Sequence, residues 1–142
     1  LPFAAFIPED YISDLPQRLQ VYQQLARVTS KDEIGPIESE LQDRFGRLPV
    51  QVDNLLFAAH VRSLARDAGV EGISRERKLI CIRMKYPFGG ALPLVERILS
   101  PVARVGGTMV RLPSGNGWTD SLAWVLEELI KFQVRTLNLV GE

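Results

Sequence analysis

The sequence has little of the chemistry on which most small catalytic and metal-binding domains depend. Its 142 residues include one cysteine and one histidine, which excludes an internal disulfide and a typical structural zinc site. His60 stands between apolar positions of a helical pattern, which favours a core or boundary histidine over the base of a nucleophilic triad. Cys81 alternates within a strand pattern, so we expect a small buried hydrophobe. No metal and no cofactor is expected.

A phosphate-binding loop is also missing. Glycine pairs occur in PFGGALP and VGGTMV, but neither is followed by the lysine and the Ser/Thr that contact phosphate and magnesium. We interpret both stretches as turns. The chain is therefore expected to be no enzyme and to have no small-molecule substrate.

Long apolar runs are absent, because no stretch approaches the roughly 18–20 residues of a membrane span. The opening LPFAAFIP is too short for a signal peptide and lacks a basic start. The chain begins with Leu1 rather than methionine, and we expect it to be a piece of a longer protein. With a single cysteine, it fits a reducing cytoplasm without membrane contact.

Charge of one sign does not dominate, since seventeen basic residues balance seventeen acidic ones. A net charge of zero argues against a dedicated nucleic-acid-binding protein. The charge is uneven along the chain: residues 1–43 carry −5, residues 44–111 carry +7 and residues 112–142 carry −2. We expect this polarity to serve solubility or to orient a partner.

Two capped helices are predicted after an extended lead-in over residues 1–12. Asp14 with Gln17 three residues later predicts the first cap, and Ser30 with Glu33 predicts the second. The first helix carries an apolar stripe with spacings of three and four residues. The stripe consists of Leu15, Leu19, Tyr22, Leu25 and Ala26.

The second helix ends in ELQDRFGRLP, residues 40–49. Gly35–Pro36 predicts a kink or a restart within it, because proline lacks an N–H and clashes with the preceding turn. Gly46 suits the left-handed position after a helix end. Pro49 then suits the first turn of a third helix over 50–68, which Gly69 ends.

The period changes to two in the second half. KLICIRMKY predicts a strand that pairs with residues 70–74 through a charged turn, and Gly106–Gly107 predicts a second hairpin. A short helix over 92–99 separates the hairpins, and a last helix starts at Trp118. The fold class is α+β: three N-terminal helices, two short β-hairpins around a short helix, and a closing C-terminal helix.

Three motifs together resemble a known family. FIPEDYISDLPQRLQVYQQLARV, residues 6–28, followed by ELQDRFGRLP, is similar to the C-terminal domain of bacterial transcription-repair coupling factors. Such domains begin with IPEDYI, continue with an RL.LY helix, and have a second helix that ends in ELxDRFG.LP. The match covers Ile7–Ile12, Arg18–Leu19 with Tyr22, and Glu40–Pro49. Gly35–Pro36 departs from the family pattern.

The resemblance implies a role. The whole factor is a DNA translocase that acts on stalled RNA polymerase and recruits excision repair through UvrA, and its ATPase motor lies upstream. The C-terminal domain packs on an N-terminal UvrB-like module, covers the UvrA-binding surface and keeps the factor repressed. Residues 1–13 are then a lead-in from the motor, and residues 14–142 are a single regulatory domain in a bacterial cytoplasm. RNA polymerase and DNA are reached only through the parent protein.

Glu40, Asp43 and Arg44 are the candidate partner-binding residues. Helical spacing places them together beside the apolar stripe of the second helix, and the resemblance implies contact with the UvrB-like module. A solvated face with a Glu40–Arg44 pair is the interpretation that the residues alone favour.

Two other interpretations stay open. An isolated ligand-binding or enzymatic domain would need a pocket whose residues the sequence does not reveal. A small nucleic-acid-binding module would use a set of basic side chains to contact phosphate, although no aromatic residues interleave them. That set is Arg62, Arg66, Arg75, Arg77 and Lys78.

Overall fold

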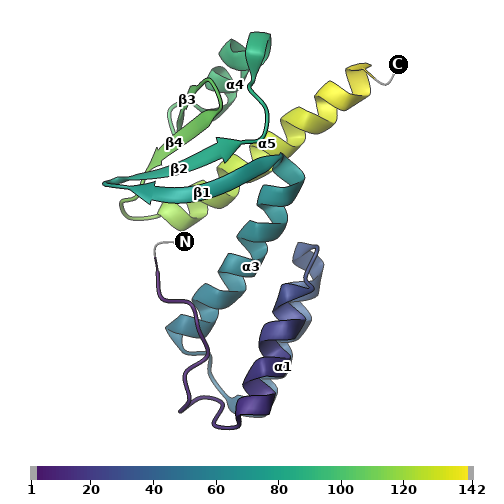
Figure 1. Cartoon of the computed structure of the whole chain (residues 1–142), viewed down its shortest axis with the longest axis vertical. Coiled ribbons are helices and arrows are strands. Elements are labelled where there is room, and N and C mark those ends of the chain that lie inside the picture. The colour runs from purple at the N-terminus through teal and green to yellow at the C-terminus, as the bar shows by residue number, and fades with distance from the viewer. Residues whose placement is uncertain (1–2, 141–142) are drawn as a thin grey trace. The chain divides into compact units, whose positions relative to one another are not determined.

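The computed structural model of the chain describes residues 3–140, with side chains up to residue 133. Leu1, Pro2, Gly141 and Glu142, which the predicted domain limits include, lie outside the described residues. The architecture is α+β, as the sequence predicts (Figure 1). The chain divides into two compact units, a helical unit of residues 3–63 and a sheet unit from residue 64 onward.

The helical unit holds an N-terminal lead-in segment and three helices around one apolar core. Every predicted helix of this half is present, and α3 begins and ends where the sequence predicts. The buried residues of this core come from the lead-in and from all three helices, and they include Ile7, Ile12, Leu25, Leu41 and Val52. The helices are α1 (Leu15–Ala26), α2 (Ile34–Phe45) and α3 (Val50–Ala68), whose last turn belongs to the sheet unit.

The first predicted cap is confirmed and the second is wrong. The Asp14 carboxylate accepts a hydrogen bond from the backbone N–H of Gln17 at 3.2 Å. Ser30 makes no side-chain cap bond. Instead the Glu33 carboxylate turns back to Thr29 and accepts its backbone N–H at 2.7 Å. A single 3₁₀ turn, η1 (Lys31–Glu33), separates this contact from α2, so the reciprocal geometry of a capping box is not available to Ser30.

Gly35–Pro36 does not interrupt a helix. The α-helix begins at Ile34, so Pro36 lies in the first turn, where a missing N–H costs no intrahelical hydrogen bond. The predicted kink or restart of the helix at Pro36 is therefore wrong, and α2 begins two residues before Pro36.

The apolar stripe of α1 is only partly buried. Leu25 is 3% exposed, but Leu15 and Leu19 are about half exposed, at 55% and 50%. Val21, which the predicted stripe did not include, is buried instead. The buried face of α1 is therefore rotated relative to the stripe that spacing alone selects.

The sheet unit contains one four-stranded antiparallel sheet in the order β1-β2-β4-β3. Both predicted hairpins form, but the second turn is shifted by one residue from the predicted Gly106–Gly107, because Gly106 is the last residue of β3 and lies opposite Met109. The hairpins are joined into one sheet because β2 pairs with β4. Gly107, with φ 56°, makes the second turn possible without a Cβ penalty. The strands are β1 (Val70–Glu76), β2 (Leu79–Met84), β3 (Arg104–Gly106) and β4 (Met109–Pro113).

Two helices cover one face of this sheet. A 3₁₀ turn, η2 (Gly89–Ala91), leads into α4 (Leu92–Leu99), and α5 (Trp118–Val140) follows β4. Figure 1 shows α5 running behind the strands. The buried layer comprises Ile80, Ile82, Val95, Leu99, Val110, Leu112, Leu122, Val125, Leu126 and Leu129. Cys81 is also buried, as predicted. No described helix is long and apolar enough to span a membrane.

Candidate functional site

The candidate residues Glu40, Asp43 and Arg44 all lie exposed on the last turn and a half of α2. The Glu40 and Arg44 side chains form an ion pair, with 3.5 Å between Oε1 and Nη1, and about half of each side chain is exposed. The Arg44 guanidinium also lies 4.9 Å above the ring centroid of Phe45. This cation–π contact adds stacking to the ion pair, so Arg44 is held against the helix rather than extended into solvent.

A groove of about 200 Å³ lies beside this ion pair, between α1 and α2. Glu40, Arg44 and Phe45 line it from α2. Asp43 does not line it. The opposite wall is made by three glutamines of α1 that share one side at positions i, i+3 and i+7. They are Gln17, Gln20 and Gln24. These glutamines are not among the sequence-predicted candidates, although their helical spacing is visible in the sequence.

The end of α2 is fixed by the lead-in. The Tyr11 hydroxyl donates its one proton between two carbonyl oxygens at the helix end, with the shorter distance, 2.8 Å, to Gly46 and 3.1 Å to Leu41. Its ring lies 5.8 Å from the ring of Phe45. Burial raises the pKa of Tyr11 above its ordinary 10.0, and the Asp53 carboxylate raises it further. The hydroxyl therefore remains a hydrogen-bond donor to a higher pH than the hydroxyl of a free tyrosine.

Gly46 ends α2 with φ 89° and ψ −166°. Its positive φ is as predicted, but the extended ψ is not that of the left-handed helix, and this backbone region is essentially restricted to glycine. Its N–H still donates to the Gln42 carbonyl oxygen at 3.0 Å. The corner that presents the charged turn is thus fixed by backbone geometry as well as by Tyr11.

The lead-in itself is fixed by side chains of α1 and α3. The Tyr22 hydroxyl accepts the backbone N–H of Ile7 at 2.8 Å, and Arg18 donates to the Ile12 carbonyl oxygen at 2.8 Å. Asn54 donates to the Ala4 carbonyl oxygen at 2.9 Å. The predicted extended lead-in is only partly correct. Residues 4–8 have no regular secondary structure, but residues 9–11 form a turn, in which the N–H groups of Tyr11 and Ile12 donate to the Pro8 carbonyl oxygen at 3.1 and 3.2 Å. The segment packs as part of the helical unit.

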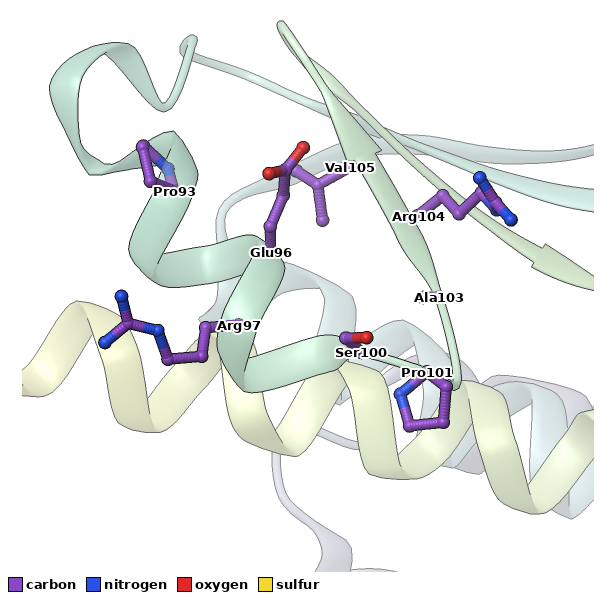
Figure 2. A pocket seen from close by; sticks show the side chains of 8 residues that line it. All are labelled: Pro93, Glu96, Arg97, Ser100, Pro101, Ala103, Arg104 and Val105. Carbon is purple, nitrogen blue, oxygen red and sulfur yellow. The ribbon is translucent and has the colours of Figure 1, made fainter.

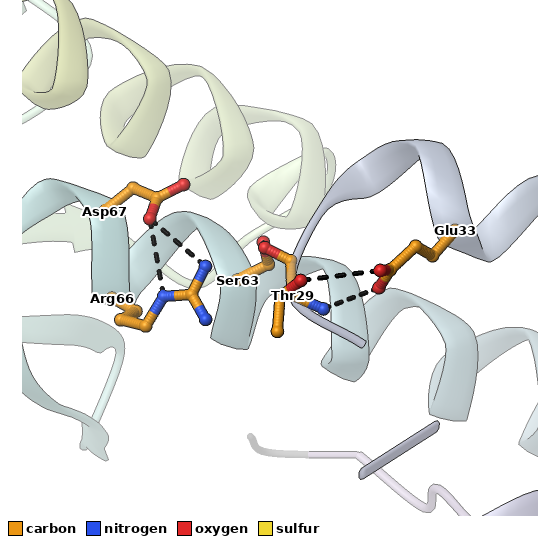
Figure 3. A network of polar contacts seen from close by, with 5 residues as sticks. All are labelled: Thr29, Glu33, Ser63, Arg66 and Asp67. Carbon is orange, nitrogen blue, oxygen red and sulfur yellow. Dashed lines mark hydrogen bonds and ion pairs between the residues drawn. The ribbon is translucent and has the colours of Figure 1, made fainter. Parts of the chain in front are cut away.

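The connection after α1 is closed by a second group of polar contacts (Figure 3). Glu33 approaches both the N–H and the hydroxyl of Thr29, and the buried Ser63 hydroxyl donates to the Thr29 carbonyl oxygen at 2.9 Å. These bonds satisfy the backbone of Thr29 within the helical unit. The contacts among Thr29, Glu33 and Ser63 are structural, because these polar groups hydrogen-bond to one another.

The basic residues of the nucleic-acid alternative are partly engaged with the chain. Arg62 donates to the Leu25 carbonyl oxygen within the helical unit. In the sheet unit Arg66 pairs with Asp67 at 3.3 Å, and Arg75 donates to the Arg77 carbonyl oxygen at 3.2 Å. Lys78 lies in the β1–β2 turn. These contacts give the nucleic-acid interpretation no support.

A hollow of about 660 Å³ lies between α4 and β3. Its charged side chains do not converge: Figure 2 shows Arg97 and Arg104 pointing away from each other on opposite sides. A site that binds a small molecule needs convergent polar groups. Among the described residues no three His, Cys, Asp or Glu side chains gather to hold a metal ion.

Residues 1–87 match the TRCF domain family. Transcription-repair-coupling factors from three bacteria show sequence similarity. The protein from Myxococcus xanthus is 37% identical over 73 residues, 51% of this chain and 6% of its own length. The Borreliella burgdorferi protein is 26% identical over 112 residues, 79% of this chain and 10% of its own. The Staphylococcus aureus protein is 27% identical over 132 residues, 87% of this chain and 11% of its own.

A solved structure shares the fold. The crystal structure of a C-terminal domain of transcription-repair coupling factor superposes with a TM-score of 0.79 at 23% identity, and the match covers 92% of this chain and 89% of that one. This chain spans about a tenth or less of the length of the curated relatives it matches. The similarity therefore concerns one domain of much longer proteins.

Proposed function

Because this chain belongs to the TRCF domain family, we propose that it is the non-catalytic regulatory C-terminal domain of a bacterial transcription-repair coupling factor. In this proposal it docks on the UvrB-like module of the same polypeptide, covers the surface that binds UvrA, and keeps the factor repressed. RNA polymerase and DNA act on the domain only through the rest of the factor, in the cytoplasm. The domain supplies contacts and no chemistry.

The observation that carries the proposal is the rigid presentation of the charged turn Glu40–Arg44. Arg44 is held by Glu40 and by the ring of Phe45, and the helix end beneath it is held by Tyr11. Side chains that are ordered before docking lose less conformational entropy on contact. A charged surface on a fixed corner can therefore set the orientation of a partner through its charges.

The proposal is tested in the full-length factor with the double variant Glu40→Lys and Asp43→Lys. The fold should be retained, since exposed substitutions usually change the free energy of unfolding by no more than about 0.5 kcal/mol. Docking should fail, because two reversed charges then face the partner, and like-charge contacts are strongly unfavourable. The expected result is higher basal ATPase activity together with UvrA binding in the absence of RNA polymerase.

The matched control reverses two exposed acids of the sheet unit, Glu71→Lys and Glu127→Lys, with the same change in net charge. This control should stay repressed. If the Glu40/Asp43 variant melts normally and remains repressed with UvrA still excluded, the turn is a solvated face and the docking proposal is wrong.

A further inference from the structure

The open face of the sheet carries a cluster of arginines that is separate from the proposed docking turn on α2. In the antiparallel register, residues that lie opposite each other share a face. Arg111 lies opposite Arg104 on one side and Cys81 on the other. Arg83 follows two positions along β2 from Cys81, so its side chain belongs to the same face. Arg83, Arg104 and Arg111 are all exposed.

The opposite face is the one that α4 and α5 cover. Its residues Ile80, Ile82, Val110 and Leu112 are all fully buried. Figure 2 shows Val105, which pairs with Val110, directed toward α4, whereas Arg104 points away from α4. The arginine face is therefore the face of the sheet that no helix of this unit covers.

The three arginines have no ion-pair partner among the described residues. Arg104 and Arg111 are direct cross-strand neighbours, with side chains that start about 5 Å apart, and like charges in that arrangement are destabilising. The acid in this part of the face is Glu76, and its carboxylate lies 3.8 Å from the Cys81 sulfur. The cluster thus retains an uncompensated positive charge, which favours an anionic partner.

The composition of the face favours a protein partner over a nucleic acid. Leu79, which is 38% exposed, and the half-buried Met109 lie among the arginines. Arginine and methionine are enriched in protein–protein interfaces, whereas lysine is depleted there. The paired positions of this face include no lysine and no aromatic ring on which a base could stack.

We propose that the exposed arginines Arg83, Arg104 and Arg111 of this sheet face dock a protein segment that carries carboxylates beside apolar side chains. The guanidinium groups bind the carboxylates, where paired N–H donors match paired oxygens. Leu79 and Met109 contact the apolar side chains of the segment. This surface lies in the sheet unit, so it is independent of the Glu40–Arg44 turn and of the proposed function.

The test uses the 142-residue chain and a soluble synthetic peptide in which glutamates are interspersed with leucines. Binding is measured by fluorescence anisotropy at moderate salt, and the contacted residues are mapped by amide chemical-shift changes. We expect saturable binding, with shifts concentrated in β2, β3 and β4. The double variant Arg104→Gln and Arg111→Gln should bind at least about tenfold more weakly, because two charge-assisted contacts are lost.

Three controls make the result specific. The double variant Arg47→Gln and Arg97→Gln removes the same charge elsewhere and should bind as the unmodified chain does. A peptide with glutamine in place of glutamate should not bind. Duplex DNA is the third probe: if it binds more tightly than the peptide and loses affinity in the Arg104/Arg111 variant, the face is a nucleic-acid surface. That outcome, or peptide binding that is absent or equally weakened by both double variants, overturns the proposal.

Discussion

The hydroxyl of Tyr11 donates a hydrogen bond to the carbonyl oxygen of Gly46, 2.8 Å away and 35 positions later in the chain. This bond joins the IPEDYI segment to the DRFG segment at the end of α2. Tyr22, from the RL.LY segment, accepts the N–H of Ile7. The three sequence motifs are therefore parts of one contact system, which fixes the corner that presents Glu40 and Arg44.

Tyr11→Phe should destabilise the helical unit by about 1 kcal/mol, because a typical intramolecular hydrogen bond contributes about 0.5–1.5 kcal/mol. The ring contact with Phe45 would remain, so the decrease in the free energy of unfolding would measure the contribution of the hydroxyl. Chemical denaturation followed by circular dichroism measures the change. Tyr86→Phe is the control, since Tyr86 is 78% exposed and its substitution should leave the midpoint unchanged. Equal effects of the two variants would contradict this role for Tyr11.

The same hydroxyl predicts a pH dependence at the alkaline end. Burial raises the pKa of Tyr11 above 10.0 in the folded chain, so folding favours the protonated form. Its stabilising contribution is present below the unfolded pKa of about 10 and is lost as the pH rises through the higher folded pKa. The free energy of unfolding should therefore fall more steeply above about pH 10 in the unmodified chain than in Tyr11→Phe. Parallel curves for the two proteins would refute the linkage.

Local patterns predicted the elements of the fold because caps, turn residues and periodicity act within a few residues. Asp14 and Gly69 delimit helices through contacts of this kind. The burial of α1 was less predictable: Leu19 and Val21 are both apolar, and only the packing of α2, α3 and the lead-in decides that Val21 is buried. The union of two hairpins into one sheet depends on β2–β4 pairing, which no short pattern encodes.

The candidate site was predictable to the same extent. Glu40 and Arg44 are one turn apart, so their pairing follows from helix geometry. The glutamine wall of the groove could not be predicted, because it depends on how α1 packs against α2. The anchoring of the corner could not be predicted either, because it depends on the long-range hydrogen bond from Tyr11. Predicting that Arg104 lies opposite Arg111 requires the exact register of the β3–β4 hairpin, and the sequence predicts that register only to within a residue or two.

Gly46→Ala should cost about 1–3 kcal/mol, although a Cβ at this position would meet nothing within 4 Å. The cost comes from the backbone, since φ 89° with ψ −166° is a region that only glycine adopts readily. Gly46→Asn should be no better, because asparagine tolerates the left-handed helical region and not this one. Thermal unfolding measures both. Gly90→Ala, also in open space and without positive φ, is the control and should be neutral or slightly stabilising. If Gly46→Ala left the melting temperature unchanged, the backbone at this corner would have shifted to a conformation that alanine adopts without strain.

Arg111→Gln should stabilise the isolated chain by about 0.2–1 kcal/mol at low salt, because it removes the like-charge contact with Arg104. The gain should fade as salt is raised, since exposed charges are screened beyond about 10 Å at 0.1 M and more closely at higher concentration. Arg97→Gln, on α4 rather than in a cross-strand pair, should show no such gain. A loss of stability in Arg111→Gln, or a gain that is insensitive to salt, would mean that the two side chains avoid each other.

The groove between α1 and α2 gives the most selective test of the docking surface, because two neighbouring glutamines differ in their position. Gln24 lines the groove beside Glu40 and Arg44, whereas Gln23 is exposed and does not line it. Alanine has the higher helix propensity, so both Gln24→Ala and Gln23→Ala should melt at or slightly above the temperature of the unmodified chain.

In the full-length factor the two substitutions should differ. If the partner enters the groove, Gln24→Ala loses one hydrogen bond made only on docking, and such a bond contributes about 0.5–1.5 kcal/mol. The docking equilibrium should then shift roughly two- to tenfold toward the released state, seen as a matching rise in basal ATPase activity and in UvrA binding. Gln23→Ala should leave both unchanged. If the two variants behave alike while Glu40→Lys with Asp43→Lys releases repression, the partner contacts the charged turn from outside and the groove stays unfilled.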